Sequence, residues 1–280
     1  MYEGHASDGQ EALEHGLRHA DPDTLPRQWN AISFAMGMCL LDGPAHLERA
    51  VAFAQEHLSA ARERTMRAME ADMLHVLGVG LGRQGKFDEA RAALSESTAI
   101  SEDMGLLYMS QWSKRSRGRM ELAAGDAVEA ERALRESWDV LTQMGLQSSL
   151  GETAVPLAEA LYAQGRFEEA DSTLKALKEE WASDDASINA PRLALRAKLL
   201  AADGWTRLAE ETADRALRVV RPMDWLCLQV DALLAHAEVM QSAGRQDDAL
   251  ASTDEALRIA DVKGYEAAAI TARALGEIRT

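Results

Sequence analysis

The sequence has little of what marks disulfide-linked, membrane-spanning or β-rich proteins. Its two cysteines, Cys39 and Cys227, are far apart and have no metal or redox spacing, so we expect two buried thiols in a reducing cytoplasm. No stretch is long and apolar enough to span a bilayer, and the polar start has no signal-peptide core. Aromatic residues make up only 5%, and no run of alternating β-branched residues indicates a strand. These absences favour an all-α cytoplasmic protein.

Basic residues are also scarce relative to acidic ones. The chain has 30 lysines and arginines against 46 aspartates and glutamates, a net charge of −16. A surface of this sign repels nucleic acid and anionic lipid. We therefore expect no direct nucleic-acid contact and no membrane partner.

One six-residue stretch recurs at a fixed interval and organises the chain. GRFEEA at 165–170 returns as GKFDEA at 85–90, GDAVEA at 125–130, GWTRLA at 204–209 and GRQDDA at 244–249. The successive glycines are 40, 40, 39 and 40 residues apart. A period of this size indicates a repeat array.

Each repeat is predicted to be a pair of antiparallel helices, which we call A and B. Around Gly165, apolar residues fall three and four apart on both sides, the pattern of amphipathic helices. The glycine lies where a helix end needs a left-handed residue.

Small residues keep the same phase on both helices, which lets A and B approach closely. The turn glycines are Gly85, Gly125, Gly165, Gly204 and Gly244; the B-helix alanines are Ala90, Ala130, Ala170, Ala209 and Ala249; the A-helix positions are Gly78, Gly118, Ala158, Ala197 and Ala237.

With these positions in place, the chain resembles a tetratricopeptide-repeat (TPR) protein. That family pairs a small residue on helix A with an alanine on helix B, often with an aromatic after the turn. Phe87 and Phe167 match that aromatic, whereas Ala127, Thr206 and Gln246 do not. The usual TPR period is ~34 residues, so helices or loops are longer here. The resemblance implies a right-handed α-α superhelix with a concave groove.

The repeats divide the chain into three parts. Residues 1–24 are predicted to be a partial repeat, with a turn at Gly9, an orphan B helix and a linker. Residues 25–263 hold six helical pairs, and 264–280 form a C-terminal capping helix. The predicted pairs are 25–41 with 45–60, 65–84 with 87–104, 107–124 with 127–144, 148–164 with 167–181, 190–203 with 206–220, and 223–243 with 246–262. The unpartnered first helix leads to the hypothesis that the chain is cut from a longer array.

One basic cluster in this acidic chain marks a candidate binding site. Trp112, Arg115 and Arg119 are spaced three and four apart on one helix face, which the TPR resemblance places in the groove. Matching positions on neighbouring A helices carry Asp72, His75, Glu152, Glu159 and Tyr162. Two interpretations stay open. The arginines form ion pairs between repeats, such as Arg119 with Glu159, or they and Trp112 hold an acidic peptide or a phosphate group.

Other motifs do not support catalysis or a cofactor. Gly80, Gly82 and Gly85 spell G-x-G-x-x-G, and Gly80–Lys86 spells most of a P-loop. Both motifs require a preceding strand, whereas a helix precedes them here. His15 and His19 are four apart but lack a third metal ligand. We expect no enzyme activity, no cofactor and no metal.

Three segments carry a more specific resemblance: 125–145, 161–170 and 224–257. They look like the C-terminal TPR regions of bacterial, actinobacterial-type regulators that join an adenylate or guanylate cyclase to an AAA-type ATPase, or of LuxR/MalT-like regulators. This implies a non-catalytic, regulatory protein-interaction arm. Two alternatives are a sensor that holds a short peptide or small molecule in the groove, and a scaffold that self-associates through its N-terminal helix.

Overall fold

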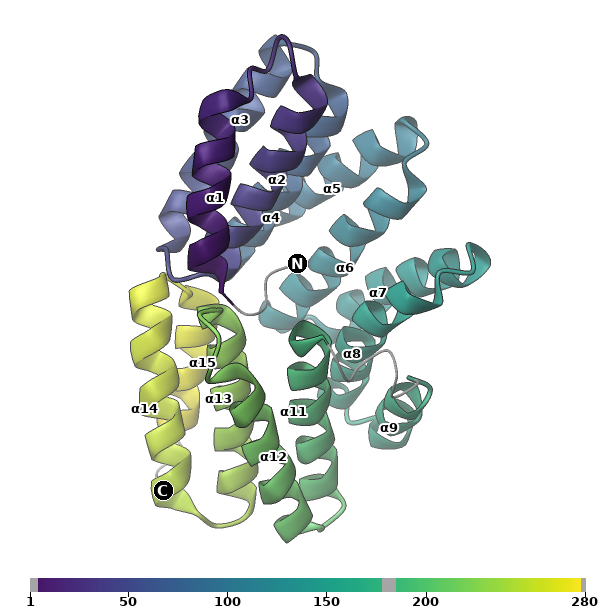
Figure 1. Ribbon diagram of the computed structural model, residues 1–280. Helices are drawn as coiled ribbons and strands as arrows, with labels where there is room; N and C mark the ends of the chain where they lie inside the picture. Colours follow the sequence, from purple (N-terminus) through teal and green to yellow (C-terminus); the bar gives the residue numbers. More distant parts are fainter. Residues whose placement is uncertain (1–4, 178–184, 278–280) are drawn as a thin grey trace.

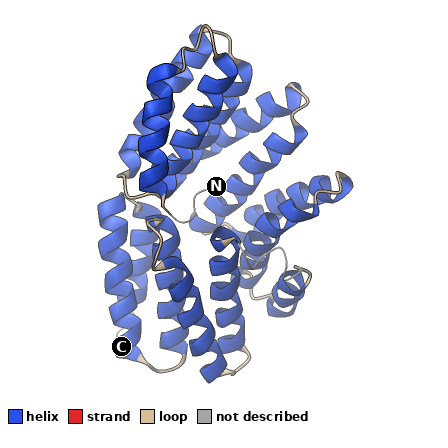
Figure 2. Ribbon diagram, viewed as in Figure 1, coloured by secondary structure: helices blue, strands red, loops and turns tan. Residues whose placement is uncertain are grey.

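The computed structural model describes residues 5–177 and 185–277, which form helices and no strand (Figures 1 and 2). The helices are α1 (Ala6–His19), α2 (Pro26–Asp42), α3 (Leu47–Glu63), α4 (Arg67–Arg83), α5 (Phe87–Asp103), α6 (Leu107–Ala123), α7 (Ala127–Gln143), α8 (Gln147–Ala163), α9 (Phe167–Lys175), α11 (Ala186–Ala202), α12 (Thr206–Val220), α13 (Leu226–Ser242), α14 (Gln246–Lys263) and α15 (Glu266–Glu277).

Most helix ends lie within four residues of their predicted positions. Two differ. Helix α1 begins at Ala6 and runs through Gly9, so the predicted turn at Gly9 is wrong; a single glycine lowers helix propensity by only ~1 kcal/mol. Helix α9 ends at Lys175, and the last residues of its predicted range lie among 178–184, outside the described residues.

The repeated glycines end the A helices as predicted. Gly85 has a φ of 76°; its N–H bonds the carbonyl of Gly82 while the Lys86 N–H reaches back to Leu81. This pair of bonds is a Schellman motif, which needs a left-handed residue. The other four turn glycines also have positive φ.

The small A-helix positions bring the two helices of a repeat together. A Cβ placed on Gly118 would lie 2.5 Å from Cγ of Leu134, and one on Gly78 would lie 2.6 Å from Cγ of Leu94. Both leucines are fully buried. The missing Cβ therefore lets a leucine of helix B lie directly against helix A in these two repeats.

The A helices form a continuous layer, and the B helices lie outside it. Helices α2, α4, α6, α8, α11, α13 and α15 each contact the next member of this series. Two contacts also cross from one end of the series to the other, α13 with α2 and α15 with α4. Figure 1 shows the purple N-terminal helices directly above the yellow C-terminal ones. The solenoid therefore closes on itself, and we call the contact between its ends the seam.

Candidate functional site on the inner face

Side chains on the A helices face one another across the layer. The Tyr162 hydroxyl on α8 donates a 2.8 Å hydrogen bond to Glu238 on α13, past the intervening α11. Arg119 on α6 influences the pKa of Asp231 on α13. The hydrogen bond between the non-adjacent helices α8 and α13 shows that the layer curves toward this side, which we call the inner face.

All eight predicted site residues come from three successive A helices. Asp72 and His75 are on α4; Trp112, Arg115 and Arg119 are on α6; Glu152, Glu159 and Tyr162 are on α8. The predicted ion pair between repeats forms from a different arginine. Arg115 pairs with Glu152, whereas within the described residues Arg119 has no such direct partner and instead acts electrostatically on Glu159.

An aromatic cluster surrounds Trp112. Phe34 of α2 stacks on Trp112 with ring centroids 5.5 Å apart, and Tyr108 meets Trp112 edge-on at 5.8 Å. His75 lies 6.1 Å from Phe34. Burial, with Arg115 and Arg83 nearby, lowers the pKa of His75 to about 4, so it is neutral at pH 7. Its Nδ1 lies 3.1 Å from the Ser113 hydroxyl.

Polar atoms beside this cluster are buried without partners in the described part of the chain. They are Trp112 Nε1 and Arg115 Nη1, which are donors, and Asn30 Oδ1, which is an acceptor. Asp72 accepts a 3.0 Å bond from Asn30 Nδ2, but burial still raises its pKa to about 6. Unsatisfied polar atoms cost ~1–3 kcal/mol each. A buried polar atom of this kind needs a partner, which an ordered water or a ligand can supply.

A row of alternating charges runs along the same face. Arg119, Glu159, Lys198 and Glu238 occupy one repeat position on α6, α8, α11 and α13. Lys198 Nζ lies 2.7 Å from Glu238 and 4.7 Å from the centroid of the Tyr162 ring. Burial raises the pKa of Glu159, while Arg119 and Lys198 oppose that rise. We call these four residues the charge row.

The structure adds site residues that sequence reasoning missed. Lys198 and Glu238 follow Arg119 and Glu159 by 79 residues each, so the repeat period was a usable signal. Asn30 and Phe34 precede Asp72 and His75 by 42 and 41 residues. This small departure from the 40-residue period hid them.

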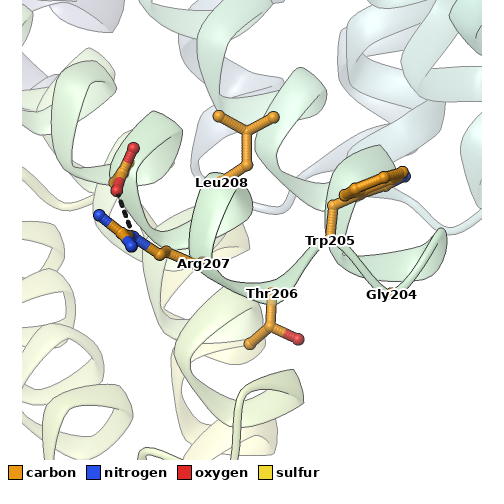
Figure 3. A pocket seen from close by; sticks show the side chains of 6 residues that line it. Gly204, Trp205, Thr206, Arg207 and Leu208 are labelled. Carbon is orange, nitrogen blue, oxygen red and sulfur yellow. Dashed lines mark hydrogen bonds and ion pairs between the residues drawn. The ribbon is translucent and has the colours of Figure 1, made fainter.

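The described residues form hollows at two places of interest. One, of 240 Å³, lies at the end of the charge row and is lined partly by Tyr162, Lys198 and Glu238. The other is a shallow depression at the turn between α11 and α12, where Trp205 and Leu208 are exposed and Arg207 pairs with Glu211 (Figure 3). It does not include any inner-face residue named above.

Membrane spans and metal sites were sought in the described part of the chain. No helix in that part is long and apolar enough to cross a membrane. The described residues also hold no group of three or more histidine, cysteine, aspartate or glutamate side chains placed to bind a metal ion.

Comparison with solved structures identifies the fold. A Rap protein complexed with Competence and Sporulation Factor superposes with a TM-score of 0.73 at 14% identity, covering 93% of this chain and 70% of that one. NprR in complex with its cognate peptide NprX gives 0.64 at 12% identity, covering 96% and 82%. The apo form of NprR from B. thuringiensis gives 0.53 at 12% identity, covering 96% and 80%.

No protein-family model matches the chain, and comparison with curated proteins finds no match. At these identities the structural likeness shows the fold alone. The chain is an all-α, TPR-type helical-repeat array.

Proposed function

We propose that the chain is a non-catalytic, regulatory array of a bacterial signalling protein that holds a peptide on its inner face. The observation that carries this proposal is the mixed set of unpartnered atoms beside the aromatic cluster. Trp112 and Arg115 offer unused donors, while Asn30 offers an unused acceptor. A peptide backbone presents carbonyls and N–H groups together, so one extended segment can satisfy both kinds.

A phosphate or a lone carboxylate fits this set less well. An anion would accept from Trp112 and Arg115 but would leave Asn30 Oδ1 without a donor, and it would be repelled by ionised Asp72. The charge row offers both signs in alternation, which favours a ligand with mixed polarity. Stacked Phe34 and Trp112 add an apolar surface on which a peptide side chain can pack.

The comparisons support the same class of ligand. The Rap and NprR structures with the higher TM-scores are complexes with Competence and Sporulation Factor and with the cognate peptide NprX, and apo NprR superposes less well. We further propose that the array belongs to a larger multidomain regulator. An immunoblot of source cells with an antibody to the array would show a product well above 30.5 kDa; a product of that mass would contradict this part of the proposal.

Capture from a randomised hexapeptide library on the immobilised protein tests the ligand class. Enriched peptides, resynthesised with a fluorescent label, should bind wild type and lose at least about tenfold in affinity on R115A/R119A, because charge-assisted hydrogen bonds are lost. The matched control is R207A, whose arginine pairs with Glu211 beside the outer depression. Circular dichroism checks that helicity is kept. Enrichment of no sequence, or equal binding to the double variant, would overturn the proposal.

A further inference from the structure

The seam is held by two charged side chains that each cap a helix at the opposite end of the chain. Lys263, the last residue of α14, is fully buried. Its Nζ donates to the carbonyls of Leu40 at 2.8 Å, Gly43 at 2.6 Å and Ala45 at 2.6 Å. An ammonium has three protons, so every one is used. The Leu40 carbonyl lies in the last turn of α2, Gly43 caps that helix and Ala45 follows in the loop. At a helix C-terminus acceptors lack helical partners and a positive charge is favoured.

The second contact has the opposite polarity. Asp224, which precedes α13, accepts hydrogen bonds from the backbone N–H groups of Ala6 at 2.6 Å and Ser7 at 2.8 Å, and from the Ser7 hydroxyl. These N–H groups open α1, where a negative charge is favoured. The C-terminal end of the array therefore places the Lys263 ammonium at the end of α2 and the Asp224 carboxylate at the start of α1.

Other polar groups surround the buried ammonium on each packed element. Arg83 of α4 donates to the Leu41 carbonyl at 2.7 Å and to Asp42 at 2.9 Å. Cys227 of α13 lies with its Sγ 3.6 Å from the same Leu41 carbonyl. Burial lowers the pKa of Lys263 to about 8, with Cys227, Arg83 and Asp42 as its charged or titratable neighbours. The ammonium is thus the main form at neutral pH.

The seam differs from the contacts between neighbouring repeats. Those contacts bury leucine and alanine, whereas the seam buries an ammonium and carbonyls together with Tyr265. The ring of Tyr265 packs on the cores of both ends, and its hydroxyl donates to Asp231. Opening the seam returns the charge and its acceptors to water, which offsets the lost hydrogen bonds. No chain connection links the two ends directly. An interface of this kind separates without unfolding the repeats on either side.

We infer that the seam is a releasable latch: Lys263 locks the array into a closed ring, and its release opens the ring and uncovers the inner face. The inference does not depend on the identity of any ligand. Its consequence for the proposed function is that a peptide reaches the inner face more readily when Lys263 has left the end of α2.

Acetylation of the wild-type protein tests the latch directly. With limiting acetic anhydride at pH 8, mass spectrometry follows Lys263 and, as an internal control, Lys175, whose side chain is 66% exposed. Lys263 should react at least about tenfold more slowly because it reacts only in the open ring. Its rate should barely change in low urea, since opening exposes little surface. A rate that follows global unfolding, or one equal to that of Lys175, would overturn the latch.

Substitution tests it from both sides of the seam. Lys263→Met keeps the apolar stem and removes the donors, and Lys175→Met is the matched control. K263M should raise the radius of gyration in small-angle scattering with helicity unchanged, and K175M should not. Asp224→Asn serves as the second variant, with a smaller rise. An unchanged radius in both seam variants would overturn the inference. So would loss of helicity in both, because the seam would then be part of one cooperative core.

Discussion

A buried carboxylate, Glu121, and a half-buried one, Asp72, lie in different regions of the same layer and have different surroundings. Glu121 of α6 sits between helices, where Arg91 Nη2 and Nε reach it at 2.8 Å and Arg117 approaches to 3.5 Å. Asp72 of α4 faces the inner side with Asn30 as its hydrogen-bond partner. Glu121 is thus matched by arginine side chains, while Asp72 has a neutral amide as its hydrogen-bond partner. Under the proposed function, this difference distinguishes a residue that holds the fold, Glu121, from one that faces the ligand, Asp72.

The largest effect should come from breaking the shape match within one repeat. Gly118→Ala places a Cβ against Leu134 and should cost about 1–3 kcal/mol of unfolding free energy. Leu134→Ala alone should cost about 2–5 kcal/mol. The double variant should cost less than the sum, because each change relieves the other. Urea denaturation of all four proteins gives the coupling energy.

The chain supplies its own precedent for this double variant. In the repeat formed by α11 and α12, the equivalent positions carry Ala197 and Ala213, which share one core cluster. If the losses of unfolding free energy in the Gly118→Ala and Leu134→Ala variants simply add in the double variant, the sizes of the two residues are not coupled.

The next effect comes from removing the matched charge. Glu121→Gln leaves Arg91 with a neutral partner and should lower the free energy of unfolding by about 1–3 kcal/mol, since a buried ion pair is broken from one side. The Arg91 side chain is 34% exposed, so water limits the loss. Thermal and urea denaturation measure it. Glu211→Gln, in an exposed pair with Arg207, is the control and should change little.

The unmatched carboxylate should respond in the opposite direction. Burial raises the pKa of Asp72 from 3.8 to about 6, so the folded protein holds this proton more tightly than the unfolded one. Wild-type stability at this site is therefore full below pH 3.8 and falls as pH rises through 6. Asp72→Asn should stabilise the protein by about 1–3 kcal/mol at pH 7.5, and the gain should vanish near pH 4.

Peptide affinity of the Asp72→Asn variant tests whether this carboxylate serves binding rather than stability. Under the proposed function, D72N should gain stability at pH 7.5 and lose affinity for library-selected peptides. A variant that is less stable than wild type at pH 7.5 would show that the carboxylate supports the fold, as Glu121 does.

The sequence predicts the fold closely because the features that define a repeat lie close together along the chain. Turn glycines, small residues such as Gly118 and apolar spacing each act within one helical pair. The charge row was also predictable from the sequence, since Lys198 and Glu238 keep the period of Arg119 and Glu159. The seam was not predictable. Lys263 meets Leu40 across 223 residues, and that meeting depends on small rotations added over all the repeats.

The smallest effect concerns Trp205, at the N-cap of α12. The equivalent residues in other repeats are charged: Lys86, Asp126, Arg166 and Arg245. The tryptophan is 62% exposed, so it contributes little buried area. Trp205→Lys should change the free energy of unfolding by less than about 0.5 kcal/mol, measured by urea denaturation. A loss above about 1 kcal/mol would place this outer edge with the matched helix contacts, and the division between fold-holding and ligand-facing residues would no longer follow the two faces of the layer.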